Sequence, residues 1–600
     1  MALLQDLPDE VTLARACAFG STALLDRIWE KSSPEAVSKL RSGGWSIYKF
    51  LRADPHYYRA QFSQSLVVAA QRGDLAVVQW LFRHFSGCIA AVEVVEEAAA
   101  GGHLQILQFL LVNSTHADIE AVHEVSSGDF RGDGAAHSVV WGGQDMTAAA
   151  KNRHGDVVQW LYENTRDAER DGTHVMEFAV RNGDRPLIEW LLPNTNVESP
   201  LFRSPTLDDA AKGGHLDIVQ WLFQLGYGRS SDYALQSAAS TGQLEIVQWL
   251  VNNGVTVNGD LAVVYASSHG HLSIVQFLLD RNFGKKATWA LSHAIGNGHL
   301  EVAQYLLSKG FVRICGDNVM DAAKHGHLDV VQWLFAEFGD DPGIDLFKPS
   351  KGIRMGVINY TSAMDAAASK GYLDIVRFLH EKAALRQGEE ESMGVPPSGD
   401  KQKKLGKRKR RPSCSKMAMD HAAWNNRMEV VQWLHTNRTE GCTKNALVFS
   451  ATNGHLEMVQ WLLENTRAFC TPAVMDGAAQ NGHLAVVQWL HENRTEGCTT
   501  RAMDGAARCG HLEVVQWLHV NRSEGCTASA MDLAAANGHF EILLFLHSQR
   551  SVGCNEYAFR NTKINRQAHI LAWLKQHYLD SNGLFKRDRS HLGLEVPRNG

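Results

Sequence analysis

The chain has 600 residues, of which 44% are hydrophobic and 21% charged, with a formal net charge of -6. One hydrophobic core does not extend over this length, so we expect several domains or an array of repeats. The charge balance is ordinary and gives no global argument for nucleic-acid binding. The stretch MALLQDLPDEV lacks a basic segment before an apolar run, and no run of about 18 apolar residues occurs, so we expect neither a signal peptide nor a membrane span.

The first 60 residues lack the regular pattern that follows them. We interpret residues 1–60 as a helical cap or degenerate repeats, with Trp29 as part of that cap. The alternative is that LPDEV, at Leu7 to Val11, begins an F-box-like segment that would tether the chain to a ubiquitin ligase. The later Cys and Trp pattern of that segment is not evident, so the cap is preferred.

From residue 61 onward the main signal is internal repetition. An aromatic residue followed by Leu recurs sixteen times, and successive copies from Trp221 to Trp333 and from Trp433 to Trp573 are 28 residues apart. The sixteen are Trp80, Phe109, Trp160, Trp190, Trp221, Trp249, Phe277, Tyr305, Trp333, Phe378, Trp433, Trp461, Trp489, Trp517, Phe545 and Trp573. These positions predict an array of about 16 copies of one structural unit.

Each unit is predicted to contain two short helices. In GHLEVVQWLHVN, at 510–521, the polar residues gather on one side of a helical wheel, and the preceding half of the unit is rich in Ala and ends at a Gly. No segment of the repeat alternates with period two, so we expect no strands in it. So small a helix pair cannot bury its own apolar face, which predicts an all-α helix-loop-helix solenoid stabilised by stacking.

The motif AxxGHLEVVQWL resembles the ankyrin repeat family, and the resemblance covers most of residues 61–574. The unit is 28 rather than 33 residues long, and the missing residues fall where that family has its β-hairpin finger. The resemblance therefore implies a finger-less variant that binds a protein partner through its first helices and short loops.

Three irregular inserts interrupt the array. We expect ankyrin-like repeats at 61–112, 146–336, 361–383 and 413–574, inserts at 113–145 and 337–360, a disordered linker at 384–412 and a tail at 575–600. The linker has an acidic run, a Pro-Pro-Ser-Gly sequence and a basic run, which makes it the expected hinge between two blocks. Its residues Lys407, Arg408, Lys409, Arg410 and Arg411 form a candidate nuclear import signal, with a solvated linker and direct nucleic-acid binding as the alternatives.

Three other residue types recur once per unit. Histidines in the Gly-His position are His103, His215, His271, His299, His327, His455, His483, His511 and His539, and aspartates before the Ala pair are Asp321, Asp365, Asp420, Asp476, Asp504 and Asp532. Stacked helices lie about 8 to 10 Å apart, whereas two ligands of one zinc must lie within about 4 Å. We therefore expect structural roles, with histidines that bond across the inter-repeat loop, and an aromatic ladder that lies in the core.

The segment NRTEGCT, at 437–443 and 493–499, contains the third ladder, which is made of cysteines. Cys414, Cys442, Cys470, Cys498, Cys526 and Cys554 are 28 residues apart, and each precedes a Ser, Thr or Asn. These polar residues are favoured helix N-caps, so we expect the cysteine to act as a small apolar residue that packs beside the cap. The charged residues of the same loops are candidate partner-facing residues: Arg438, Glu440, Arg494, Glu496, Arg522 and Glu524.

No catalytic, phosphate-binding or metal-binding motif occurs in the sequence. We therefore predict a non-enzymatic protein-protein interaction scaffold without cofactor or metal, with ubiquitin-ligase adaptor as the alternative function. The expected partner is another protein, not a membrane or a nucleic acid, and the chain is expected to be a monomer. Ten cysteines are too few for a disulfide scaffold, which favours a cytoplasmic or nuclear location.

Overall fold

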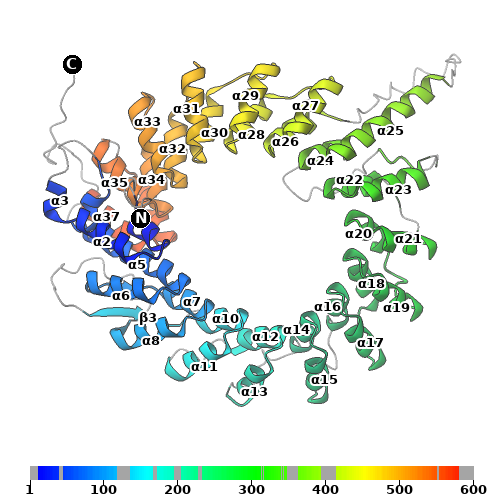
Figure 1. Ribbon diagram of the computed structural model, residues 1–600, viewed down its shortest axis with the longest axis horizontal. Helices are drawn as coiled ribbons and strands as arrows, with labels where there is room; N and C mark the ends of the chain where they lie inside the picture. The colour runs from blue at the N-terminus through cyan, green and yellow to red at the C-terminus, as the bar shows by residue number, and fades with distance from the viewer. Residues whose placement is uncertain are drawn as a thin grey trace. The chain divides into compact units, whose positions relative to one another are not determined.

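The computed structural model describes residues 11–38, 45–117, 136–142, 144–165, 172–194, 205–226, 233–311, 314, 316–339, 341, 344–347, 362–392, 414–550 and 553–579. The chain divides into two compact units (Figure 1). Unit 1 comprises residues 1–201 and 500–600, and unit 2 comprises residues 202–499. In sequence, unit 2 is therefore inserted between the two segments of unit 1.

Unit 1 contains helix pairs from both ends of the chain and three short strands. Its elements are α1 (Leu13–Cys17), α2 (Thr22–Lys31), α3 (Pro34–Ser38), α4 (Tyr48–Leu51), α5 (Pro55–Arg72), α6 (Leu75–His84), β1 (Ile89–Ala90), α7 (Val92–Ala100), α8 (Leu104–Asn113), β2 (Ser114–Ala117), β3 (His137–Val140), α10 (Asp145–Lys151), α11 (Gly155–Asn164), α12 (Gly172–Asn182), α13 (Arg185–Asn194), α32 (Thr500–Cys509), α33 (Leu512–Asn521), α34 (Ala528–Ala536), α35 (Phe540–Gln549), α36 (Glu556–Ile564) and α37 (Ala568–Tyr578).

Unit 2 consists of nine helix pairs over its described residues. They are α14 (Pro205–Gly213), α15 (Leu216–Gln224), α16 (Ala234–Ser240), α17 (Leu244–Asn252), α18 (Gly259–Ser268), α19 (Leu272–Asp280), α20 (Ala290–Gly296), α21 (Leu300–Ser308), α22 (Gly316–His325), α23 (Leu328–Phe338), α24 (Ala363–Lys370), α25 (Leu373–Ser392), α26 (Lys416–Trp424), α27 (Met428–Asn437), α28 (Lys444–Thr452), α29 (Leu456–Asn465), α30 (Pro472–Gln480) and α31 (Leu484–Asn493). The all-α helix-loop-helix solenoid is confirmed.

The core lies between the first helices of successive repeats and under the second helices. Within unit 2, first helices pack in succession from α14 to α30, and each also packs against its own second helix. The paired alanines, such as Ala238 and Ala239, are buried at these contacts. Small side chains let the helix axes approach closely, which is why Ala predominates in the first helices. The second helices contribute larger apolar residues, such as Ile246, Val247 and Leu250, which are also buried.

The turn between the two helices of a repeat explains the Gly-His dipeptide. Gly454 has a φ of 77°, which favours glycine, and a Cβ atom built on it would lie 2.4 Å from Nδ1 of His483 in the next repeat. His455 in turn lies 3.0 Å, through Nε2, from the carbonyl oxygen of Trp424 in the repeat before it. His271, His299 and His539 make the same contact with a carbonyl oxygen one repeat earlier. The prediction of structural histidines that bond across the inter-repeat loop is confirmed at these positions.

The inserts do not interrupt the stack of first helices. Helix α7 packs against α10, α22 against α24, and α24 against α26, so repeats on either side of each insert are direct neighbours. The division into units falls at 201/202 and 499/500 rather than in the linker. The helices on either side of the linker, α24 and α26, pack as neighbours, and most of 384–412 lies outside the described residues, so the hinge expected there stays a prediction. Helix α25 also extends to Ser392, so this segment begins as helix.

A small parallel sheet departs from the strand-free expectation. Strands β1, β3 and β2 pair in that order, with Ile89 opposite Ser138 and Ser114 opposite His137. The first strand belongs to the loop before α7, and the other two lie in the insert expected at 113–145. These strands are too short for a period-two pattern to be visible in the sequence, which is why the sequence did not reveal them.

In unit 1, helix α5 packs against the last helix pair of the chain. The Trp573 indole donates a hydrogen bond to the Asp54 carboxylate at 2.9 Å, and the Tyr57 hydroxyl donates to Glu541 at 3.2 Å. The ring of Tyr57 also lies edge-on to Phe540. Burial raises the pKa of Glu541, and hydrogen bonds from Tyr57 and Gln61 oppose that rise. The first and last repeats of unit 1 thus cover each other's apolar faces.

Candidate functional site

The cysteines and the residues after them start the first helices of the second array. Helices α26, α28, α30, α32, α34 and α36 each begin at the residue after the predicted cap. Ser415, Thr443 and Thr527 accept a hydrogen bond from the backbone two residues on, as a cap does. Thr471 and Asn555 occupy the cap position without a side-chain cap bond. The predicted helix starts are therefore confirmed, and three of the caps are closed by their own side chains.

The thiols are shielded rather than reactive. Nine cysteines are free in the described part of the chain, and Cys414 and Cys498 are buried. Burial raises the pKa of Cys414 to about 12 and also raises the pKa of Cys442, Cys470 and Cys526. A protonated thiol is a weak nucleophile and a poor metal ligand. The arrangement therefore agrees with the structural interpretation of this ladder.

The aspartates hold the cap of the next repeat, which the sequence did not reveal. Asp420 accepts hydrogen bonds from the backbone nitrogen of Thr443 at 2.7 Å and from its hydroxyl at 2.6 Å. The same pair of contacts joins Asp476 to Thr499 and Asp504 to Thr527, and Asp532 accepts from the backbone nitrogen and the side-chain amide of Asn555. A carboxylate on one repeat thus fixes where the next repeat begins.

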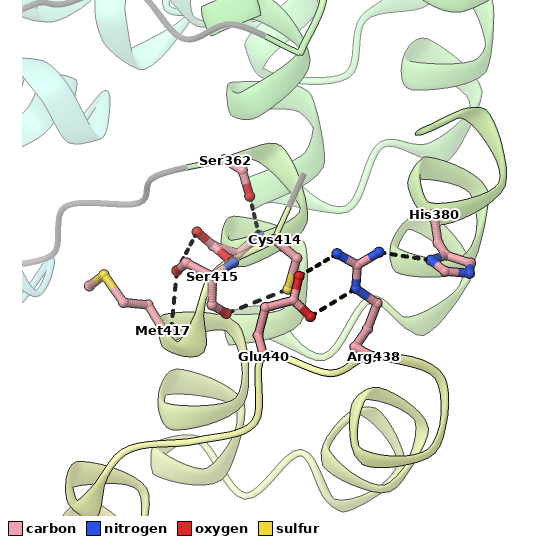
Figure 2. A network of polar contacts seen from close by, with 8 residues as sticks. Ser362, His380, Cys414, Ser415, Met417, Arg438 and Glu440 are labelled. Carbon is pink, nitrogen blue, oxygen red and sulfur yellow. Dashed lines mark hydrogen bonds and ion pairs between the residues drawn. The ribbon is translucent and has the colours of Figure 1, made fainter. Parts of the chain in front are cut away.

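The same kind of contact joins the repeats on either side of the linker, around Ser415, which Figure 2 shows with Ser362 and Met417. Asp365 of α24 accepts hydrogen bonds from the backbone nitrogen of Ser415 at 2.8 Å and from its hydroxyl at 3.0 Å. The Ser415 hydroxyl also accepts from the nitrogen of Met417 at 3.1 Å, and the Asp365 nitrogen donates to the Ser362 hydroxyl at 3.1 Å. Two helices separated by the linker are therefore joined as adjacent repeats.

Asp321 does not belong to this ladder. It lies 12 residues before its aromatic residue Trp333, whereas Asp365 lies 13 residues before Phe378. This shift of one residue turns the side chain to another side of the helix, and Asp321 is exposed. The sequence interpretation, which placed Asp321 with the others, is wrong at this position.

The charged loop residues pair with each other. Arg494 lies 2.6 Å from Glu496, and ion pairs of the same kind join Arg438 to Glu440 and Arg522 to Glu524. The hydrogen bond from Arg494 lowers the pKa of Glu496. Arg438 also contacts His380 of the preceding repeat (Figure 2). The Arg438–Glu440 and Arg522–Glu524 pairs are half-buried and Arg494 is exposed, and the part of all three pairs in binding a partner stays a prediction.

The aromatic ladder is half-buried in most of the array rather than part of the core. Trp80, Phe545 and Trp573 are buried, whereas Trp249 and Trp461 keep part of their surface exposed. Each of the latter two meets the preceding second helix edge-on: Trp249 contacts Phe223, and Trp461 contacts His435. The ladder thus joins neighbouring second helices along their outer side.

The basic run at 407–411 and most of the LPDEV segment lie outside the described residues. Both the import signal and the adaptor alternative therefore stay predictions. None of the described helices combines the length and apolar character that crossing a bilayer requires. No group of three or more candidate metal ligands occurs among the described side chains.

A row of exposed apolar residues lies at the starts of three first helices of unit 2, with Tyr233 and Trp289 at the N-caps of α16 and α20 and Leu261 in the first turn of α18. Tyr233, Leu261 and Trp289 are 28 residues apart and are 61%, 47% and 55% exposed, and Tyr265, one turn after Leu261, is 44% exposed. We call these four residues the aromatic face. The corresponding positions in the second array are Met417, Asn445, Ala473, Arg501, Ser529 and Tyr557, so large apolar residues occupy the first and last of them but not the four between. These side chains are exposed, so the core does not require them to be apolar. We therefore take the aromatic face as the candidate binding surface.

Sequence reasoning missed this surface, although a signal was present. Tyr233, Leu261 and Trp289 all lie 16 residues before an aromatic residue of the ladder. Helices α16, α18 and α20, at whose starts they lie, pack in succession. Neighbouring packed helices lie about 8 to 10 Å apart, so the aromatic face forms a strip about 20 Å long.

Comparison with known proteins matches parts of the chain to one family. Family models described as "Ankyrin repeats (3 copies)" match residues 207–288 and 418–504, and one described as "Ankyrin repeats (many copies)" matches residues 289–335. No curated protein matched the chain. Similar solved structures include the pentatricopeptide repeat protein PPR10 from maize, with 12% identity, a TM-score of 0.25 and 93% of each chain covered.

The same maize protein in complex with an 18-nt psaJ RNA element gives 10% identity and a TM-score of 0.28, with 93% of this chain and 89% of that chain covered. TM-scores this low carry no inference about fold or ligand. The family matches are specific, and they agree with the helix pairs and their Gly-His turns. Residues 207–335 and 418–504 of this chain are ankyrin repeats.

Proposed function

We propose that the protein is a non-enzymatic scaffold that binds a protein partner on the aromatic face of unit 2. Ankyrin repeats are typical of interaction scaffolds, and the aromatic face is the single observation that supports this surface. Large apolar side chains on an exposed face gain most from being covered by a partner, and aromatic residues are enriched at such interfaces.

The spacing of the aromatic face favours an amphipathic helix as the partner segment. A helix rises 1.5 Å per residue, so residues i and i+7 lie on one face about 10.5 Å apart. That distance is close to the separation of neighbouring first helices, about 8 to 10 Å. Three apolar side chains at i, i+7 and i+14 would therefore each meet one repeat, at Tyr233, Leu261 and Trp289.

Proximity labelling with the full chain tests this proposal. Cells express either the wild type or the double variant Tyr233→Ser, Trp289→Ser, and labelled proteins are compared by quantitative mass spectrometry. We expect the double variant to lose a defined set of partners. For a purified partner, each substitution of a central aromatic residue should cost about 2 kcal/mol of binding free energy, or about a 30-fold rise in Kd.

The matched control is Tyr557→Ser. Tyr557 is 66% exposed and occupies the same position of the repeat in α36, outside the aromatic face. This variant should keep the partner set of the wild type. An unchanged partner set in the double variant would exclude the aromatic face, and recovery of a ubiquitin-ligase subunit that depends on residues 7–11 would favour the adaptor alternative.

A further inference from the structure

A cavity of about 300 Å³ lies inside unit 1, where α5 meets the segments that precede α7 and α37. Its walls come from parts of the chain about 500 residues apart in sequence, since Arg59 and Arg566 both line it. The volume is at the lower end of the range for small-molecule sites, which is about 300 to 1,000 Å³. The cavity belongs to neither the aromatic face nor the paired loops of the second array.

The charged groups of the lining are mainly cationic. Arg59 and Arg566 line the cavity, and Glu93 is the one carboxylate among its lining residues. Two histidines, His56 and His569, join them. Burial, with further contributions from Arg59 and His56, lowers the pKa of His569 to about 4. A lowered pKa keeps the His569 imidazole uncharged at neutral pH, so the cationic groups of the lining are Arg59 on α5 and Arg566 in the turn before α37.

The rest of the wall is apolar or donates hydrogen bonds. Ile89, Val92 and Phe540 provide apolar surface, and the side-chain amides of Gln64 and Gln567 also face the cavity. Gln567 is the N-cap of α37, and its side chain makes no cap hydrogen bond. The first turn of α37 therefore begins at this wall without a side-chain cap. Backbone N–H groups of a first helical turn add to the positive potential of nearby arginines.

We propose that this cavity binds a small organic anion, a carboxylate or a phosphate monoester on an apolar stem. The acid group binds between Arg59 and Arg566, and guanidinium groups suit carboxylate and phosphate alike. The stem lies against Ile89, Val92 and Phe540. A molecule held in this way contacts α5 and the turn before α37, so its binding stabilises the contact between the first and last repeats of unit 1.

Calorimetric titration and thermal unfolding of the full chain test the site with three probes. Hexanoate and hexyl phosphate carry the two acid groups on the same stem, and 1-hexanol is the uncharged match. We expect at least one anion to bind and raise the Tm, and 1-hexanol to bind at least about tenfold more weakly, because it lacks the charged partner of the arginines. Which anion binds decides between the carboxylate and the phosphate monoester.

Three variants locate the binding, and one controls for the loss of a surface charge. Arg59→Gln and Arg566→Gln should each raise the Kd of the anion at least about tenfold. Val92→Phe fills the cavity without a change of charge and should abolish binding. If Arg59→Gln does not fold, Val92→Phe and Arg566→Gln still test the site, because the Arg566 side chain is exposed. Arg560→Gln removes an exposed arginine of α36 that does not line the cavity and should bind like the wild type.

Three results would overturn the proposal. The first is that neither anion binds at concentrations up to about 10 mM. The second is that 1-hexanol binds as tightly as the anions, which would leave the arginines without a role. The third is that Arg566→Gln and Val92→Phe both bind the anion as the wild type does, which would place binding elsewhere.

Discussion

The repeats around α18 and those around α28 share one fold but use the outward face of their first helices differently. In α26, Asp420 bonds to the cap of the next repeat, and in α24, Asp365 does the same. In α18 and α20 the corresponding positions, 13 residues before the aromatic residue, hold Val264 and Ser292. There, Tyr265 and Trp289 are exposed instead.

This difference separates residues that the stacking of repeats requires from residues that can vary without disturbing it. Buried alanines and the Gly-His turn recur in both regions, so they belong to the fold. The carboxylate contact occurs in α24 and in much of the second array, and Glu96 of α7 makes the same kind of contact with the cap nitrogen of Gln144. The aromatic face occurs in the repeats of α16, α18 and α20. A surface that differs between repeats while the core stays constant is where a partner can be recognised.

The largest expected effect tests whether the two regions differ only in their first helices. Trp249→Ala and Trp461→Ala remove half-buried rings that meet the preceding second helix in the same way, so each should cost about 2 kcal/mol of unfolding free energy. Trp573→Ala, at a buried ring, should cost about 3 to 5 kcal/mol. Denaturant unfolding measures all three, and unequal costs for the first two would show that the regions also differ in their second helices.

The carboxylate contact gives the next largest effect. Asp420→Ala removes two hydrogen bonds and leaves the Thr443 nitrogen without its acceptor, so we expect a loss of about 1 to 2 kcal/mol. Ser292→Ala, at the corresponding position of α20, should change stability by less than about 0.5 kcal/mol. Equal losses in thermal or denaturant unfolding would contradict the proposed difference between the regions.

A change of about 1 kcal/mol is expected at the cap itself. Thr499→Ala removes the hydroxyl that bonds to Asp476 and should cost about that much. Cys498→Ala, at the residue before the cap, should be milder because a small apolar side chain replaces another. Fast reaction of Cys498 with a thiol reagent in the folded protein would contradict its buried, apolar role.

The histidines predict a pH effect that both regions share. Burial lowers the pKa of His299 and His327 in the first array and of His455 in the second, below the ordinary value of 6.5. The unfolded chain therefore binds more protons than the folded one, so this stability is present above pH 6.5 and is lost as the pH falls below it. His455→Gln introduces the residue that Gln243 provides at the equivalent position of another repeat, and it should reduce the slope of unfolding free energy between about pH 7 and 5.5. An unchanged slope would exclude His455 from the effect.

The smallest effect on stability is expected at the aromatic face. Tyr233→Ser and Trp289→Ser change exposed side chains, so each should alter unfolding free energy by less than about 0.5 kcal/mol. Both should nevertheless weaken partner binding strongly. A large loss of stability in thermal unfolding would show that these rings serve the fold, and the difference between the two regions would then lose its functional meaning.

Much of the fold could be predicted because its signals are local. The 28-residue spacing, the helix starts at Thr443 and Thr527, and the Gly-His turns each depend on residues close together in sequence. The candidate site was harder to predict. Whether an apolar residue is buried or exposed depends on how the repeats pack. The exposure of Tyr233 and Trp289 was therefore not visible in the sequence.

Tertiary structure decided the contacts between distant segments. Asp365 reaches Ser415 across the linker, and Asp54 reaches Trp573 from the opposite end of the chain. No local pattern encodes such pairs, because their free energy is gained only when other repeats have brought the two segments together. The sequence by itself determined the repeat, its helices and its turns. The tertiary structure decided which inserts are bypassed, how the ends of unit 1 meet, and where an anionic ligand and a partner helix are proposed to bind.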